Sequence, residues 1–481
     1  MTLVEANNII SNLSNYSDDE IIKIYHSIYK TLIDNYCYIE AEEFAILLVK
    51  KIKDVDQKVI IIRRYLFSPI KLYSLFKAVG GLCFDEKVKV FKKLFKNYKF
   101  KSVNELLDIP NNLKFGTELE YSDSSCNAIE LLFDSDTINA LMMAIGINDD
   151  IIDRISKNTC FKKSNDHNKA VFTIEMVDDR FPELSTMVFN NNFVDLNTLK
   201  AYYSIMYILK AKVNSCTALH INVGVDYFEN NSDCIKYLLS IWGECEELFY
   251  KIANKENTVI RSYASDMAIQ IKDNINRTLN ENYPIKLDNM DDYYRFLYNI
   301  QVREDLLVLL KFPNIEDSNE FEKYLFADDE DVRYQVFRNM FNYSGKDIMG
   351  RVKCKSVNFN HLSCDNGLVG RIEFRMFDNI MDFDTILSNI TLIGKVMYVC
   401  KELANNNCTL LEKYNNLLNR DVSEEDKLDL LLDLLFDDDK RYIFKRRWES
   451  VKDNTYYNRF YSSTETFIPI HKEKQLKKTT F

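Results

Sequence analysis

The sequence predicts an α+β protein: a helical N-terminal region, followed by an antiparallel sheet that carries helices on one face. Residues 1–109 show apolar positions three and four apart, which is typical of amphipathic helices. Four later segments alternate polar and apolar residues and are rich in β-branched and aromatic side chains, as half-buried strands are. They read KFGTELEY (114–121), AVFTIEM (170–176), ALHINVGV (218–225) and RIEFRMF (371–377). Long helical stretches separate them, so helices are expected to cover one face of the sheet.

Three regions follow from these patterns. Residues 1–109 are expected to form an N-terminal helical domain, because Pro110 and two asparagines interrupt the helical periodicity there. Residues 110–439 hold all the expected strands and a helical insertion at about 265–345. Residues 440–481 form an aromatic and basic C-terminal segment.

Composition excludes several classes of protein. The formal net charge of −11 argues against nucleic-acid binding by the molecule as a whole. The eleven cysteines include no C-x-x-C pair, which indicates reduced thiols in a cytoplasmic protein. No signal pattern opens the chain and no apolar run reaches about 18 residues, so no membrane span is expected. The lysine-rich segment 86–101 fits either a solvated amphipathic helix or a site for nucleic acid or an acidic partner.

The polar positions of three segments carry groups suited to metal binding. Glu118 and Glu120 share one face, because side chains on a strand repeat every two residues. Their mutual repulsion would be relieved by Mg²⁺, which prefers oxygen ligands, although a solvent-facing strand edge is the simpler alternative. Similarly, His220 shares a face with Asn222, and Glu183 opens the short segment PELS.

The segment RIEFRMF separates charged and apolar residues most clearly between the two faces of a strand. Arg371, Glu373 and Arg375 lie on one face, opposite Ile372, Phe374 and Met376. The charged face fits two structures equally well. One is a row of solvent-exposed ion pairs, and the other is a site for phosphate and a metal ion. Four strands with the same division favour a multi-metal nucleotide site on the open face of the sheet.

In this order the motifs FGTELEY, FTIEMVD with PELS, CTALHINVG, and VNFN with RIEFRMF resemble the amidoligase family. These carboxylate–amine ligases share the fold of glutamine synthetase and glutamate–cysteine ligase. The resemblance covers roughly residues 113–400 and leaves out residues 1–109, the insertion at about 265–345 and the C-terminal tail. It implies a glutamine-synthetase-like catalytic domain that uses ATP and Mg²⁺ to join an acid and an amine through an acyl phosphate. The expected partners are a small-molecule or peptide carboxylate and an amine donor, and the N-terminal helices could add a protein partner.

The resemblance also implies residue roles. Metal ligands would be Glu118, Glu120, Glu183, His220 and Glu373. Arg375 would contact the transferring phosphate or the substrate carboxylate, and Arg371 the nucleotide phosphates, with Glu373 completing the catalytic set. Asn222 and Arg261 would help to bind the nucleotide, and Asn358 stands where the family often has an asparagine.

One position departs from the family pattern. Asn222 stands where the family has a second histidine, and asparagine is a poor Mg²⁺ ligand that cannot act as a base. About two fifths of the chain lies outside the motifs. A non-catalytic binding or scaffold protein on a ligase-derived fold is therefore the alternative function.

Overall fold

A computed structural model gives the structure of the chain. It describes residues 1–67, 72–122, 132, 134–161, 172–176, 182–213, 217–229, 231–253, 357–358, 370–378, 380–418, 422–437 and 440–452. The helical insertion expected at about 265–345 lies outside these residues, as does the C-terminal segment beyond residue 452.

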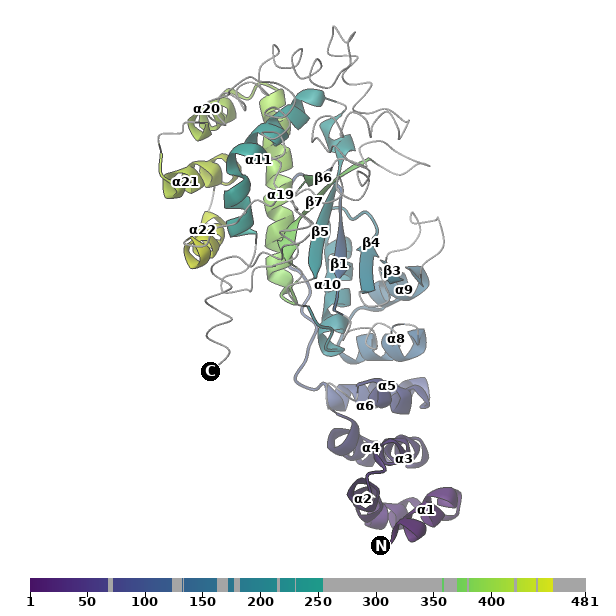
Figure 1. Cartoon of the computed structure of the whole chain (residues 1–481). Helices are drawn as coiled ribbons and strands as arrows, with labels where there is room; N and C mark the ends of the chain where they lie inside the picture. The colour runs from purple at the N-terminus through teal and green to yellow at the C-terminus, as the bar shows by residue number, and fades with distance from the viewer. Residues whose placement is uncertain are drawn as a thin grey trace, which may run out of the picture.

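A seven-stranded sheet in the order β2-β3-β4-β1-β5-β7-β6 forms the centre of the structure (Figure 1). The strands are β1 (Phe115–Glu120), β2 (Thr159–Phe161), β3 (Phe172–Met176), β4 (Pro182–Thr186), β5 (Ala218–Gly224), β6 (Val357–Asn358) and β7 (Arg371–Asp378). Neighbouring strands pair antiparallel except β2 and β3, which are parallel, so the sheet is mixed at one edge. All four strand segments predicted from alternation are present, and the α+β class is confirmed.

Three long helices bury the apolar face of this sheet: α10 (Phe193–Ile208), α11 (Ser232–Ile252) and α19 (Phe383–Ala404). The Trp242 ring of α11 lies 5.1 Å from that of Phe374 on β7, and α10 packs Tyr202 at 4.4 Å from Phe172 on β3. The side chain of Ile372 is also fully buried. Removing these side chains from water stabilises the fold by about 2 kcal/mol each.

Helix α19 is the only helix in the described part of the chain that is long and apolar enough to cross a membrane. Two thirds of its most apolar window (67%) is buried inside the molecule. It packs against α11 and β5, and against the C-terminal helices α20 (Cys408–Leu417) and α21 (Glu424–Leu435). A further helix, α22 (Lys440–Val451), packs against α11 and α21. The apolar surface of α19 is therefore used by the core of this fold.

Six N-terminal helices form an arm that extends away from the sheet toward the N-terminus (Figure 1). This helical arm consists of α1 (Leu3–Ser11), α2 (Asp18–Asp34), α3 (Tyr38–Lys51), α4 (Val55–Ile61), α5 (Leu72–Gly80) and α6 (Phe84–Leu94). Capping boxes begin α1 at Thr2 and α2 at Ser17. The stack continues past residue 110, because α6 packs on α8 (Ser135–Ala144), which contacts α9 (Asp149–Asn158).

The lysine-rich segment 86–101 is helical over only part of its length, and two of its lysines are paired with carboxylates. Helix α6 ends at Leu94, although the spacing predicted helix as far as residue 101. Lys87 is buried against Asp136 of α8, and Lys93 pairs with Asp56 of α4, so part of the basic charge is neutralised by carboxylates of neighbouring helices.

The segment between α6 and β1 packs closely against α19. A Cβ atom at Gly394, in the middle of α19, would lie 2.3 Å from Cγ2 of Ile109. The Nζ atom of Lys395 lies 2.8 Å from the carboxylate of Asp108. These contacts fix the arm's connection to the same helix that supports the sheet.

Candidate functional site

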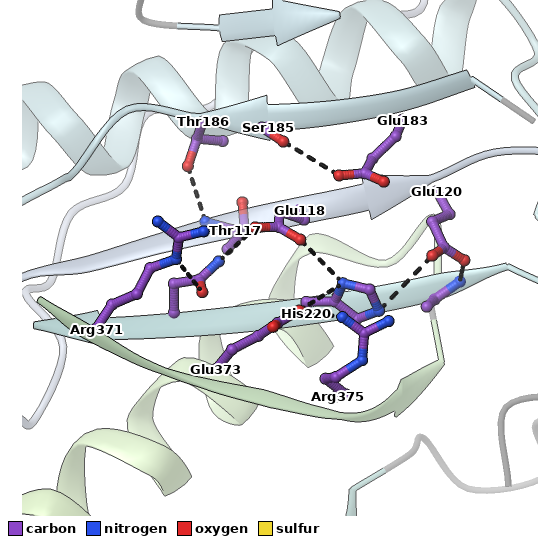
Figure 2. A network of polar contacts seen from close by, with 12 residues as sticks. Thr117, Glu118, Glu120, Glu183, Ser185, Thr186, His220, Arg371, Glu373 and Arg375 are labelled. Carbon is purple, nitrogen blue, oxygen red and sulfur yellow. Dashed lines mark hydrogen bonds and ion pairs between the residues drawn. The ribbon is translucent and has the colours of Figure 1, made fainter. Parts of the chain in front are cut away.

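The predicted polar residues gather on the sheet face opposite α10, α11 and α19 (Figure 2). Strand register creates this arrangement, because Glu118 on β1 stands opposite His220 on β5, and Asn222 stands opposite Glu373 on β7. On the other side of β1, Glu120 stands opposite Glu183 of β4. We call this surface the polar face, and it consists of Glu118, Glu120, Glu183, His220, Asn222, Arg371, Glu373 and Arg375.

His220 lies at the centre of the polar face. Its Nδ1 atom is 3.1 Å from Oε2 of Glu118 and 3.2 Å from Oε1 of Glu373. Its Nε2 atom is 3.7 Å from Oε1 of Glu120. One ligand atom from each of Glu118, His220 and Glu373 lies within 4.8 Å of the others, which is close enough for one metal ion to reach all three. His220 and Glu373 are both buried (each 3% exposed).

Electrostatics around His220 favour its charged form. Burial and the nearby Arg375 lower the pKa of His220, but its contacts with Glu118 and Glu373 outweigh both and raise the pKa to about 9. Burial and the charge of Glu373 raise the pKa of Glu118, whereas His220 and Arg371 lower it, and the net pKa is lowered. At neutral pH the protein therefore places an imidazolium beside the ionised carboxylate of Glu118.

Asn222 connects two other members of the polar face. Its Nδ2 atom donates to Oε1 of Glu118 at 3.0 Å. Its Oδ1 atom accepts from Nε of Arg371 at 3.1 Å. Asn222, where the sequence departs from the family pattern, thus lies between a candidate metal ligand (Glu118) and a candidate phosphate ligand (Arg371).

A β-bulge shapes the far end of β7. Leu219 pairs with Phe377, but Ile221, two residues later, pairs with Phe374, so β7 has one extra residue opposite His220. The bulge keeps Phe377 fully buried, whereas strict alternation would place it on the polar face with Arg375. Arg375 still reaches the site, where its Nη1 atom donates to Oε1 of Glu373.

Glu183 and Glu120 form the acidic edge of the polar face. Oε2 of Glu120 accepts from the backbone N–H of Ala218 at 2.8 Å, and Ser185 Oγ donates to Oε1 of Glu183 at 3.2 Å. Burial, followed by the charge of Glu118, raises the pKa of Glu183 to about 7. This carboxyl group therefore changes protonation near neutral pH.

The structure brings together all but one of the site residues predicted from the sequence. Arg261 is the exception, because it lies outside the described residues. Asn358 of β6 pairs with Glu373 of β7 in the sheet register. The sequence interpretation missed Ser185, whose signal was its position two residues after Glu183, on the same face of β4.

The donor set on the polar face fits a divalent cation with oxygen ligands. Four carboxylates (Glu118, Glu120, Glu183 and Glu373) face one histidine and two arginines. Carboxylate oxygens suit Mg²⁺, and guanidinium groups suit phosphate, so the face combines both kinds of ligand. It therefore has the groups needed to hold a metal–phosphate complex.

Comparisons with known proteins place this chain in no group. No family model, no curated protein and no solved structure matches it. Inferences about function therefore depend on the polar face itself.

Proposed function

We propose that the protein is an ATP- and Mg²⁺-dependent ligase that joins a carboxylate to an amine. The observation that carries this proposal is the cluster of half-buried Glu118 with buried His220 and Glu373, flanked on the same sheet face by Arg371 and Arg375. Phosphoryl transfer needs mainly metal and cationic groups around the transferred phosphate, and this face has candidate metal ligands and two guanidinium groups. The order of the strand motifs, which resembles that of the amidoligases, supports the same reaction class.

Each group on the polar face has a role in this proposal. Mg²⁺ would be held by Glu118, Glu120, Glu183, His220 and Glu373 and would neutralise phosphate charge. Arg371 would bind nucleotide phosphates through its guanidinium group. Arg375 would contact the transferring phosphate or the substrate carboxylate, from a position fixed by its ion pair with Glu373.

The reaction would proceed in two steps. An oxygen of the substrate carboxylate attacks the γ-phosphorus of ATP, and ADP leaves, which gives an acyl phosphate. The amine nitrogen then attacks the acyl carbon and loses a proton as inorganic phosphate leaves, which forms the amide. The residues of the polar face would orient the two anions against each other, and orientation of this kind supplies a large part of catalysis.

A screen of ADP release tests this function. The protein with Mg²⁺ and ATP is offered pairs of carboxylates and amines, and the products are identified by mass spectrometry. We expect ADP release to depend on one class of pair and to disappear in Glu118→Ala and Glu373→Ala proteins that still fold by circular dichroism. Full activity in both variants would contradict the proposal.

A non-catalytic scaffold is the second candidate, and one observation favours it. His220 already places a positive charge between Glu118 and Glu373, so these carboxylates have a partner without a metal ion. The helical arm would then serve as the binding element for a protein partner. This candidate predicts no thermal stabilisation by Mg-ATP, whereas a ligase at nucleotide concentrations about 100 times Kd would gain about 2.7 kcal/mol.

A further inference from the structure

Arg371 and Glu118 carry opposite charges on the polar face, yet they are joined through a third residue. Asn222 accepts from Nε of Arg371 at 3.1 Å and donates to Oε1 of Glu118 at 3.0 Å. The second oxygen of Glu118 lies 3.1 Å from His220. Among the described residues, Asn222 is the one whose side chain hydrogen-bonds to the Arg371 guanidinium, and this bond uses Nε rather than the two terminal nitrogens.

The chemistry of the two neighbours fixes how Asn222 is oriented. A guanidinium group only donates hydrogen bonds, and an ionised carboxylate only accepts them. The amide oxygen must therefore face Arg371 and the amide nitrogen must face Glu118. A side chain that bridges these two groups needs one acceptor and one donor close together, which asparagine supplies without a net charge.

We propose that Asn222 is a positioning residue, and this inference rests on the proposed function. By holding Arg371 at Nε, it keeps the two terminal guanidinium nitrogens available for a phosphate group. By occupying the space between Arg371 and Glu118, it prevents a direct ion pair between them. The carboxylate of Glu118 thus remains a metal ligand while Arg371 remains an anion ligand.

Two substitutions separate this role from simple packing. Asn222→Asp keeps the acceptor for Arg371 but adds a negative charge, so it cancels the charge of Arg371 and adds a carboxylate next to Glu118. Asn222→Leu removes both hydrogen bonds and lets Arg371 pair with Glu118 directly. The matched control is Thr186→Val on β4, which removes the hydroxyl that accepts from the backbone N–H of Thr117 at 2.8 Å.

Calorimetric titration with two probes tests the proposal without any turnover. Inorganic pyrophosphate, in buffer with EDTA, reports on Arg371, and Mn²⁺ without nucleotide reports on the carboxylates. We expect Asn222→Asp to weaken pyrophosphate binding by about tenfold while Mn²⁺ binding stays equal or becomes tighter. We expect Asn222→Leu to weaken both probes by about fivefold or more, since the new ion pair occupies both ligands. Thr186→Val should lower the melting temperature and leave both affinities unchanged.

The outcomes distinguish this inference from the proposed function. A wild-type protein that binds neither probe overturns the proposed function, and the role of Asn222 with it. If the wild type binds both probes but Asn222→Asp weakens them equally or not at all, only the role of Asn222 is wrong. Should Asn222→Leu fail to fold, the opposite responses of Asn222→Asp to anion and cation still decide the question.

Discussion

Buried charges occur in two regions of this molecule, and they are balanced differently. In the helical arm and the helix that packs on it, each buried lysine has one acidic partner, as Lys58 has Glu86 at 3.4 Å and Lys87 has Asp136. On the polar face, four carboxylates share one histidine and two arginines. Buried charges are tolerated when they are paired, so the arm's arrangement is complete without a ligand. The polar face instead has more carboxyl groups than cationic side chains, and under the proposed function a bound metal ion would balance the difference.

The largest expected effect separates function from folding at Glu373. Glu373→Gln should reduce ADP release by at least about 100-fold, because it removes a buried metal ligand at the centre of the cluster. The free energy of unfolding should fall by only about 1–3 kcal/mol, because a glutamine amide oxygen can still accept from Arg375 and His220. Steady-state kinetics and urea unfolding measure the two effects. A variant that unfolds would show that the polar face is structural, like the ion pairs of the arm.

A methyl group added at Gly116 should have a smaller effect than Glu373→Gln, and it should change nucleotide binding rather than stability. Gly116 stands opposite Asn222, and a Cβ atom there would meet its nearest neighbour, the backbone oxygen of Met187, at 3.4 Å. This is ordinary contact, so Gly116→Ala should leave the melting temperature nearly unchanged. A ligand that approaches the backbone of β1 would meet the added methyl, and KM for ATP should rise by about tenfold. An unchanged KM would mean that the nucleotide binds elsewhere on the face.

The polar face was predictable from sequence because a strand records its two faces in alternate residues. Glu118, His220 and Glu373 could each be assigned to a polar face in this way, but their contacts could not be predicted. Those contacts depend on the pairing of β5 with β7, which brings Asn222 next to Glu373 from 151 positions away in the chain. The bulge opposite His220 was also missed, although the adjacent apolar residues Met376 and Phe377 interrupt the alternation of RIEFRMF at that end.

The packing of the arm could be predicted even less well. Helical periodicity indicated its helices, but not that α6 continues the stack onto α8, beyond the expected boundary at residue 110. A buried lysine has the same sequence signature as an exposed one, so Lys87 looked like part of a basic surface. Its partner Asp136 lies 49 residues away, and no local pattern connects them.

The ion pair between Lys87 and Asp136 should respond to mutation in the opposite way from the polar face. Asp136→Ala leaves the Lys87 ammonium group buried without its carboxylate, and should lower the free energy of unfolding by about 1 kcal/mol, since Asp136 is half exposed. Replacing both partners in Lys87→Met with Asp136→Ala should restore stability. Urea midpoints measure both effects, with ADP release unchanged throughout. A loss of activity in Asp136→Ala would mean that the arm contributes to the site.

The smallest of the expected effects is one on stability, at Asp108. Its single carboxylate pairs with Lys395 and Lys440, whereas on the polar face the carboxylates outnumber the cationic side chains. Burial raises the pKa of Asp108, but Lys395 and Lys440 outweigh it, and the folded pKa lies below the ordinary value. A lowered folded pKa means that the carboxylate stabilises the fold above about pH 4 and loses this contribution as the pH falls through the folded value. Because the side chain is 40% exposed, solvent screening limits the contribution to less than about 1 kcal/mol. The urea midpoint of Asp108→Asn should therefore lie slightly below wild type at neutral pH, and the gap should close as the pH is lowered. A gap that widens in acid would mean that the two lysines, rather than the carboxylate, determine the charge balance where the arm joins α19.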